Sequence, residues 1–89
     1  MKIKEGFILR KIAGEDVVIP IGGNIANFNG LIRLNESATF LWKQLQNDVD
    51  KESLINSLIK EYEIDLELAT KDVNAFINTL EEHKAIEGA

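Results

Sequence analysis

The chain has 89 residues, of which 45% are hydrophobic and 28% are charged, and it contains no cysteine. This length allows one domain with a modest core, so we expect a single domain over residues 1–89. The lack of cysteine excludes disulfides, thiolate catalysis and cysteine-bound zinc. The first residues lack the apolar core of a signal peptide, and no apolar run approaches the ~20 residues of a membrane span. We therefore expect a cytoplasmic protein without a membrane partner.

The net charge of −5 is divided unevenly along the chain. Residues 1–34 carry five basic and three acidic side chains, whereas residues 35–89 carry five basic and twelve acidic ones. The acidic second part would repel a phosphate backbone, which argues against nucleic-acid binding.

Three strand-like runs come first in the chain. Residues 7–13 and 16–21 are rich in Ile, Val and Leu, and Gly14 between them can adopt the positive φ of a tight hairpin turn. A loop dense in Gly and Asn follows, and residues 28–34 form the third run. The pattern predicts a small antiparallel sheet.

Three amphipathic helices are expected after the strands. Asn35, Asp50 and Asp65 each precede a helical pattern, and each can act as an N-cap by accepting a hydrogen bond from a first-turn amide. The first helix should span residues 36–46. Apolar residues at helical spacing define the expected buried faces: Ala38, Leu41, Trp42, Leu45, Leu54, Ile55, Leu58, Ile59, Tyr62, Leu66, Ala69, Val73, Phe76, Ile77 and Leu80. Ile86 should close the core, and residues 87–89 should fray. The order predicts an α+β fold, strand-strand-strand-helix-helix-helix.

Candidate catalytic and metal sites find little support. His83 is the only histidine, and it lies between Glu82 and Lys84 near the expected end of the last helix. A useful general base needs an orienting partner in a pocket, which nothing in the sequence supplies. Asp48 and Asp50 lack the glycine and the glutamate of a calcium loop. We predict no catalytic residue, no metal ligand and no cofactor.

The third strand is the first candidate binding element. A three-stranded sheet has two edges, and an exposed edge is an aggregation hazard unless it is used or protected. Arg33 alternates with Ile32 and Leu34 and therefore faces the opposite side of the strand. Its charge either protects the edge or contacts an acidic partner.

The last helix presents a second face beside its core stripe, made of Lys71, Asn74, Ala75 and Asn78. This face is either solvent-exposed or one wall of a groove whose other wall is the third strand. A strand edge beside a helix is the geometry for β-augmentation, in which a peptide adds as a further strand.

Several segments resemble the PqqD family: residues 7–15, 17–22 and 28–38, Phe40-Leu41-Trp42, and the helical stretch with Tyr62, Asp72-Val73 and Phe76. The run Leu34-Asn35-Glu36-Ser37 followed by Trp42 is the most specific element, and the resemblance covers about residues 3–86. It implies a small winged-helix-like domain of three strands and three helices. Such domains bind the leader of a ribosomally made, post-translationally modified precursor peptide and present it to a modifying enzyme, often a radical-SAM protein.

In the family the leader adds to the third strand and lies against the third helix. Combined with the helix pattern, the implied peptide-binding residues are Gly30, Leu31, Ile32, Arg33, Leu34, Lys71, Asn74, Ala75 and Asn78. We expect a non-catalytic peptide-binding adaptor. Two alternatives remain open: a winged-helix nucleic-acid binder, which the acidic third helix disfavours, and a structural subunit of an enzyme complex. The sequence also leaves open a homodimer formed through the exposed strand edge.

Overall fold

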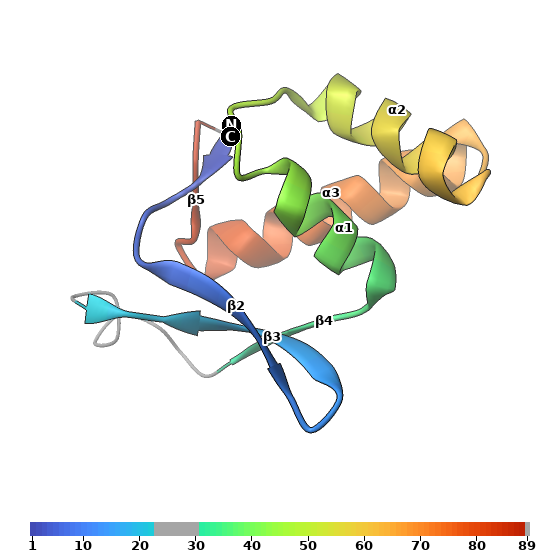
Figure 1. The fold of residues 1–89 in the computed structure, drawn as a ribbon. Helices are drawn as coiled ribbons and strands as arrows, with labels where there is room; N and C mark the ends of the chain where they lie inside the picture. The colour runs from blue at the N-terminus through green and yellow to red at the C-terminus, as the bar shows by residue number, and fades with distance from the viewer. Residues whose placement is uncertain (23–30, 89) are drawn as a thin grey trace.

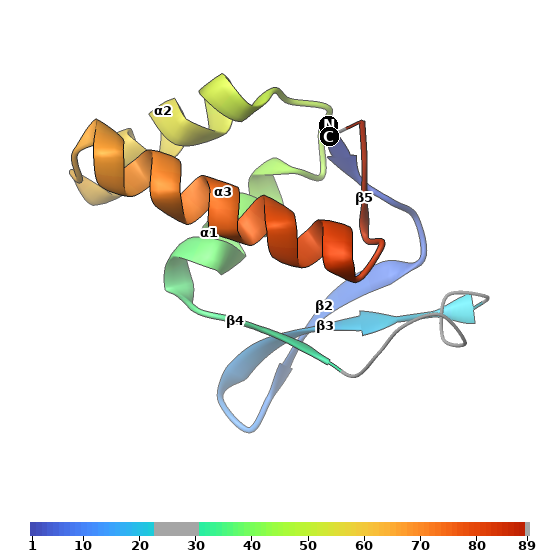
Figure 2. The ribbon, with the colours of Figure 1, turned by 180° about the vertical axis from the view of Figure 1, so that it is seen from behind.

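The structure is a computed structural model that describes residues 1–22 and 31–88. Its elements follow the chain as β1 (Lys2–Ile3), β2 (Phe7–Ile12), β3 (Glu15–Pro20), β4 (Ile32–Leu34), α1 (Glu36–Gln44), α2 (Lys51–Tyr62), α3 (Leu66–Glu82) and β5 (Ile86–Glu87). Strands β2, β3 and β4 form an antiparallel sheet in that order, and the three helices lie on one side of it (Figures 1 and 2). This arrangement confirms the predicted α+β class.

The β2–β3 hairpin turns through two residues, Ala13 and Gly14, because the last pair of the ladder is Ile12 with Glu15. Both turn residues have positive φ, 53° and 83°, as a type I′ turn requires. From the sequence this conformation was expected at Gly14 alone. Ala13 shares it although side-chain-bearing residues seldom do.

Strand β4 is an edge strand that pairs only with β3 among the described residues. Leu34 lies opposite Asp16, and Ile32 lies opposite Val18. The predicted third strand was longer, but its first residues, 28–30, lie outside the described residues, and Leu31 is not part of β4.

The three predicted N-caps are confirmed. The side chains of Asn35, Asp50 and Asp65 accept hydrogen bonds from the backbone N–H three residues later, at N···O distances of 2.9, 2.7 and 2.8 Å. Each bond satisfies an amide that has no partner within the helix. Helix α1 ends at Gln44, two residues before the predicted end, because the next residue, Leu45, already serves as its C-cap.

The core lies between the sheet and the helices. Leu45, Leu58 and Leu80 are fully buried, and Trp42 is only 3% exposed, so its expected place in the core is confirmed. No helix in the described part of the chain is both long and apolar enough to cross a membrane.

A second, two-stranded sheet joins the two ends of the chain and was not predicted. Strand β1 pairs with β5 so that Ile3 lies opposite Ile86 and Lys2 opposite Glu87. Ile86 is buried, as expected. The expectation of a frayed end from residue 87 is wrong at Glu87, because that residue belongs to β5.

Candidate functional site

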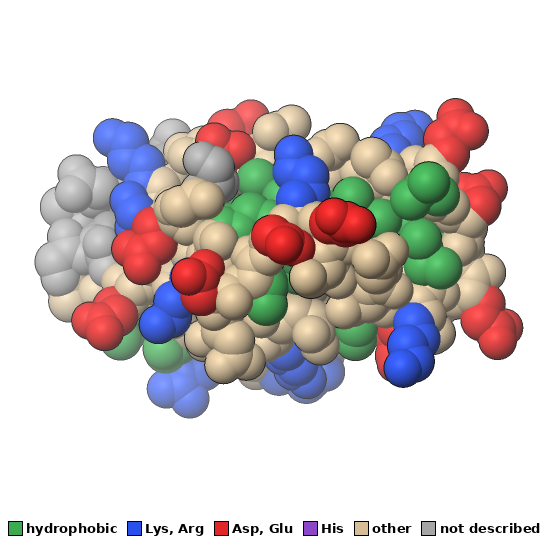
Figure 3. Space-filling model, turned by 90° about the horizontal axis from the view of Figure 1, so that it is seen from above, with side chains coloured by type: hydrophobic (Ala, Val, Ile, Leu, Met, Phe, Trp, Pro, Cys, Tyr) green, Lys and Arg blue, Asp and Glu red, His purple; other side chains and the backbone are tan. Residues whose placement is uncertain are grey.

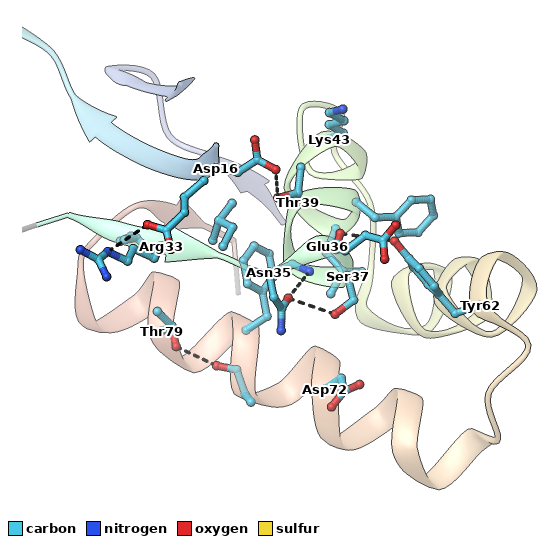
Figure 4. Close-up of a pocket in the computed structure, with 18 of the residues that line it drawn as sticks. Asp16, Arg33, Asn35, Glu36, Ser37, Thr39, Lys43, Tyr62, Asp72 and Thr79 are labelled. Atoms are coloured by element: carbon cyan, nitrogen blue, oxygen red, sulfur yellow. Dashed lines mark hydrogen bonds and ion pairs between the residues drawn. The ribbon is translucent and has the colours of Figure 1, made fainter. Parts of the chain in front are cut away.

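An open cleft of about 970 Å³ is lined by the β2–β3 hairpin, β4, most of α1, the end of α2 and α3 (Figure 4). Strand β4 contributes all three of its residues. Helix α3 contributes four residues spaced along one side: Asp72, Ala75, Phe76 and Thr79. A strand edge and helix α3 therefore both line the cleft, together with most of α1.

The wall made by β4 is fixed by its alternating side chains. Ile32 and Leu34 are 4% and 8% exposed and belong to the hydrophobic core, whereas the side chain of Arg33 is 76% exposed. Two buried anchors in three residues hold the strand against the core. Its backbone therefore forms a firm edge beside the cleft.

The junction of β4 with α1 closes one end of the cleft. Helix α1 begins directly after the strand, with Asn35 as its cap. The Asn35 Oδ1 atom accepts hydrogen bonds from the backbone N–H of Ala38 at 2.9 Å and from Ser37 Oγ at 3.1 Å. These two bonds fix the direction in which the helix leaves the strand (Figure 4).

Tyr62, the last residue of α2, packs against the same junction. Its hydroxyl donates a hydrogen bond to the backbone oxygen of Glu36 at 3.3 Å, and its ring meets the Phe40 ring edge-on with centroids 5.8 Å apart. Partial burial, and to a smaller extent the carboxylates of Glu36 and Glu61, raise the pKa of Tyr62 above its ordinary value.

The charged side chains of the cleft are of both signs. Lys11 Nζ lies 3.5 Å from Asp16 Oδ1, and Arg33 Nε lies 3.8 Å from Glu15 Oε2. Exposed ion pairs of this kind add little stability. Asp16 also accepts a hydrogen bond from Thr39 Oγ1 at 3.0 Å, which ties β3 to α1.

The described residues contain no group of three or more His, Cys, Asp or Glu side chains able to hold a metal ion. What the cleft offers is backbone hydrogen bonding along β4 and mixed apolar and polar contacts along α3. These features suit an extended peptide.

The structure brings some of the predicted site residues together and leaves others apart. Ile32, Arg33, Leu34 and Ala75 line the cleft. Leu31 stands just before β4 and is 55% exposed. Three predicted positions on α3, namely Lys71, Asn74 and Asn78, are not among the lining residues. Gly30 lies outside the described residues. The role of all nine in peptide binding stays a prediction.

Several parts of the cleft lining were not predicted from the sequence. The α3 wall lies one residue further along the helix than predicted, at Asp72, Phe76 and Thr79 as well as Ala75. Most of α1 also lines the cleft, beginning with Glu36, and so do residues of the β2–β3 hairpin, Asp16 among them. The cap signal directly after the strand could have indicated the part that α1 forms.

Comparison with known proteins identifies the family. Residues 15–86 match the family described as coenzyme PQQ synthesis protein D (PqqD). The chain belongs to the PqqD family. PqqD proteins are non-catalytic peptide chaperones, which agrees with the expectation that the chain is not an enzyme.

One solved structure, described as TbiB1 in complex with the TbiA(beta) leader peptide, is similar to the whole chain. The TM-score is 0.77 at 20% sequence identity, over 100% of this PqqD-family chain and 98% of the other. At this identity the similarity establishes a shared fold. No curated protein matches the chain.

Proposed function

We propose that this PqqD-family chain is a non-catalytic adaptor. It captures the leader of a ribosomally made precursor peptide in the cytoplasm and presents the peptide to a modifying enzyme, for which the sequence resemblance suggests a radical-SAM protein. The observation that carries the proposal is the edge strand β4, which lines a cleft that α3 also lines. TbiB1, which has the same fold, was solved with a leader peptide.

In the proposed complex the leader lies beside β4 as a fourth strand of the sheet. Along a strand, alternate residues direct their backbone N–H and C=O groups to opposite sides. Leu31 and Arg33 alternate with Ile32 and Leu34 along the chain. The backbone N–H and C=O groups of one pair can therefore bond to β3, while those of the other pair are directed to the free edge and can bond to the peptide. We assign Leu31 and Arg33 to the peptide.

Side chains of the bound leader would also alternate. Every second one would point toward α3, where Ala75 and Phe76 line the cleft. Backbone bonds along β4 would supply affinity that does not depend on sequence, and contacts with α3 would supply selectivity.

The test uses two substitutions at one position. Leu31→Pro removes a backbone N–H, whereas Leu31→Ala removes most of the same side chain and keeps the N–H. A labelled leader encoded beside the gene of this chain is titrated against both variants and the parent. We expect Leu31→Pro to lower affinity at least tenfold, because a lost hydrogen bond with a steric clash exceeds ~1.4 kcal/mol. Leu31→Ala should stay within about threefold.

Amide chemical shifts of the titrated parent locate the site independently. Changes concentrated at residues 31–34 and along residues 72–79 are expected. A folded Leu31→Pro variant with undiminished affinity would contradict pairing at this edge. A parent that binds its modifying enzyme but no neighbouring leader would instead favour the structural-subunit alternative.

A further inference from the structure

The side of the sheet that faces away from the helices forms a second surface. Leu9, Val18 and Ile32 face the core, so strand alternation directs their neighbours to the other side. Val17 supports this assignment because it is buried yet lies outside the core cluster. We call this surface the outer face; alternation assigns to it Ile8, Arg10, Ile12, Glu15, Val17, Ile19, Ile21, Leu31 and Arg33.

The outer face is mostly aliphatic and is partly open among the described residues, because Val17 is buried and Ile8 and Ile19 are half-buried whereas three other aliphatic residues are exposed. Ile12, Ile21 and Leu31 are 47%, 44% and 55% exposed. Both ribbon views place all three helices on the opposite side of the sheet (Figures 1 and 2). Large contiguous apolar patches are uncommon on monomeric proteins and mark interaction sites.

The outer face also carries two arginines and one glutamate, a balance of +1. Arg10, Val17 and Arg33 form one row across the three strands, so the two arginines flank the valine. Their backbones are about 10 Å apart, twice the usual spacing of neighbouring strands. Glu15, the one acidic residue assigned to the face, lies 3.8 Å from Arg33. Among the described residues no carboxylate forms an ion pair with Arg10 within 4.0 Å.

This charge contrasts with that of the whole chain, which has a net charge of −5. Seen from the helical side, acidic side chains are spread over the surface among basic and apolar ones (Figure 3). A partner for the outer face should therefore combine aliphatic side chains with carboxylates placed to meet the two arginines.

We propose that the outer face docks an acidic, aliphatic surface of the enzyme that modifies the captured peptide. This inference rests on the proposed adaptor function. The outer face adjoins β4, so an enzyme bound there would lie next to a peptide held on the free edge of β4. A second copy of the chain fits poorly, because a two-fold dimer through this face would bring four arginines into one interface.

The experiment measures two affinities for each variant: that for the purified modifying enzyme encoded beside the gene, and that for the labelled leader. Arg10→Glu reverses a charge of the outer face at an exposed position away from β4. Lys51→Glu makes the same change of charge at the exposed first residue of α2 and is the matched control. Ile12→Ser tests the aliphatic part.

We expect Arg10→Glu to weaken enzyme binding on the order of tenfold at low salt, with a smaller ratio at high salt. Ile12→Ser should weaken it severalfold, and Lys51→Glu should leave it within about twofold. Leader affinity should be unchanged in all three. The docking proposal is overturned if Arg10→Glu and Ile12→Ser bind the enzyme as tightly as the parent, or if the parent does not bind it.

Amide chemical-shift changes on enzyme binding that concentrate on the helices would also overturn it. So would sedimentation showing a parent dimer that Arg10→Glu dissociates, since the face would then serve a second copy. These results are separate from the adaptor proposal, which fails when the parent binds no leader.

Discussion

Replacing Asn35 with alanine should destabilise the junction on which the cleft depends. The change removes the acceptor of two hydrogen bonds, one from the Ala38 N–H at 2.9 Å and one from Ser37 Oγ at 3.1 Å. Asn35 is exposed, so no core packing is lost with it. Loss of an N-cap costs about 1 kcal/mol of unfolding free energy. For a domain of this size that corresponds to a fall in Tm of roughly 5 °C.

The assay is thermal unfolding followed by circular dichroism at 222 nm, supported by urea unfolding. Asn35→Asp is the matched control, because it keeps the acceptor and adds a negative charge that suits a helix N-terminus. Its Tm should remain within about 2 °C of the parent. The reasoning is refuted if Asn35→Ala has the parent Tm, or if Asn35→Asp loses as much stability as Asn35→Ala.

Three further predictions concern the cleft, the core and a second cap. Ala75→Trp should fill the cleft and lower leader affinity at least tenfold in an anisotropy titration, whereas Lys71→Trp, outside the lining, should change it less than about twofold. Leu58→Ala, at a fully buried position, should cost about 3 kcal/mol in urea unfolding, whereas Asn56→Ala on the exposed side of α2 should cost under about 0.5 kcal/mol. The backbone N–H of Ser53, which donates to the Asp50 cap of α2, lowers the pKa of Asp50 below 3.8. The stability that this cap contributes should therefore be present above that pH and be lost as pH falls through the lower folded-state pKa. Thermal scans from pH 5 to 2 should therefore show the parent losing Tm relative to Asp50→Asn.

Each of these has a contrary result. Equal weakening by Lys71→Trp and Ala75→Trp would place the peptide on the helix face predicted from periodicity. A small loss for Leu58→Ala would mean that α2 packs more loosely than its burial indicates. A constant Tm difference between the parent and Asp50→Asn at all pH values would show that the Asp50 carboxylate keeps its ordinary pKa in the folded state.

The sequence predicted the elements that depend on local chemistry. Asn35, Asp50 and Asp65 are caps because a short polar acceptor before an apolar helical pattern satisfies first-turn amides wherever it occurs. The hairpin followed from two β-rich runs and a glycine between them. These signals lie within a few residues of the structure that they specify.

The parts that sequence did not predict depend on distant contacts. Strands β1 and β5 have two residues each and are more than 80 residues apart, so neither shows a periodic pattern. The apolar stripe of α3 was predicted correctly from Ala69 to Leu80 but wrongly at Leu66, which is 64% exposed in the first turn of the helix. Its spacing says only which residues face the core. Whether Lys71 or Asp72 borders the cleft depends on how α3 crosses β4, which a single sequence does not specify.

The pairing of β1 with β5 brings the two ends of the chain together (Figure 1). A domain with adjacent ends can be inserted into a surface loop of another protein without being stretched or unfolded. Here the ends meet in a sheet separate from the one that carries β4. This domain could therefore be grafted into an enzyme by both ends while its β4 edge stays accessible, which would make it a portable module for peptide capture.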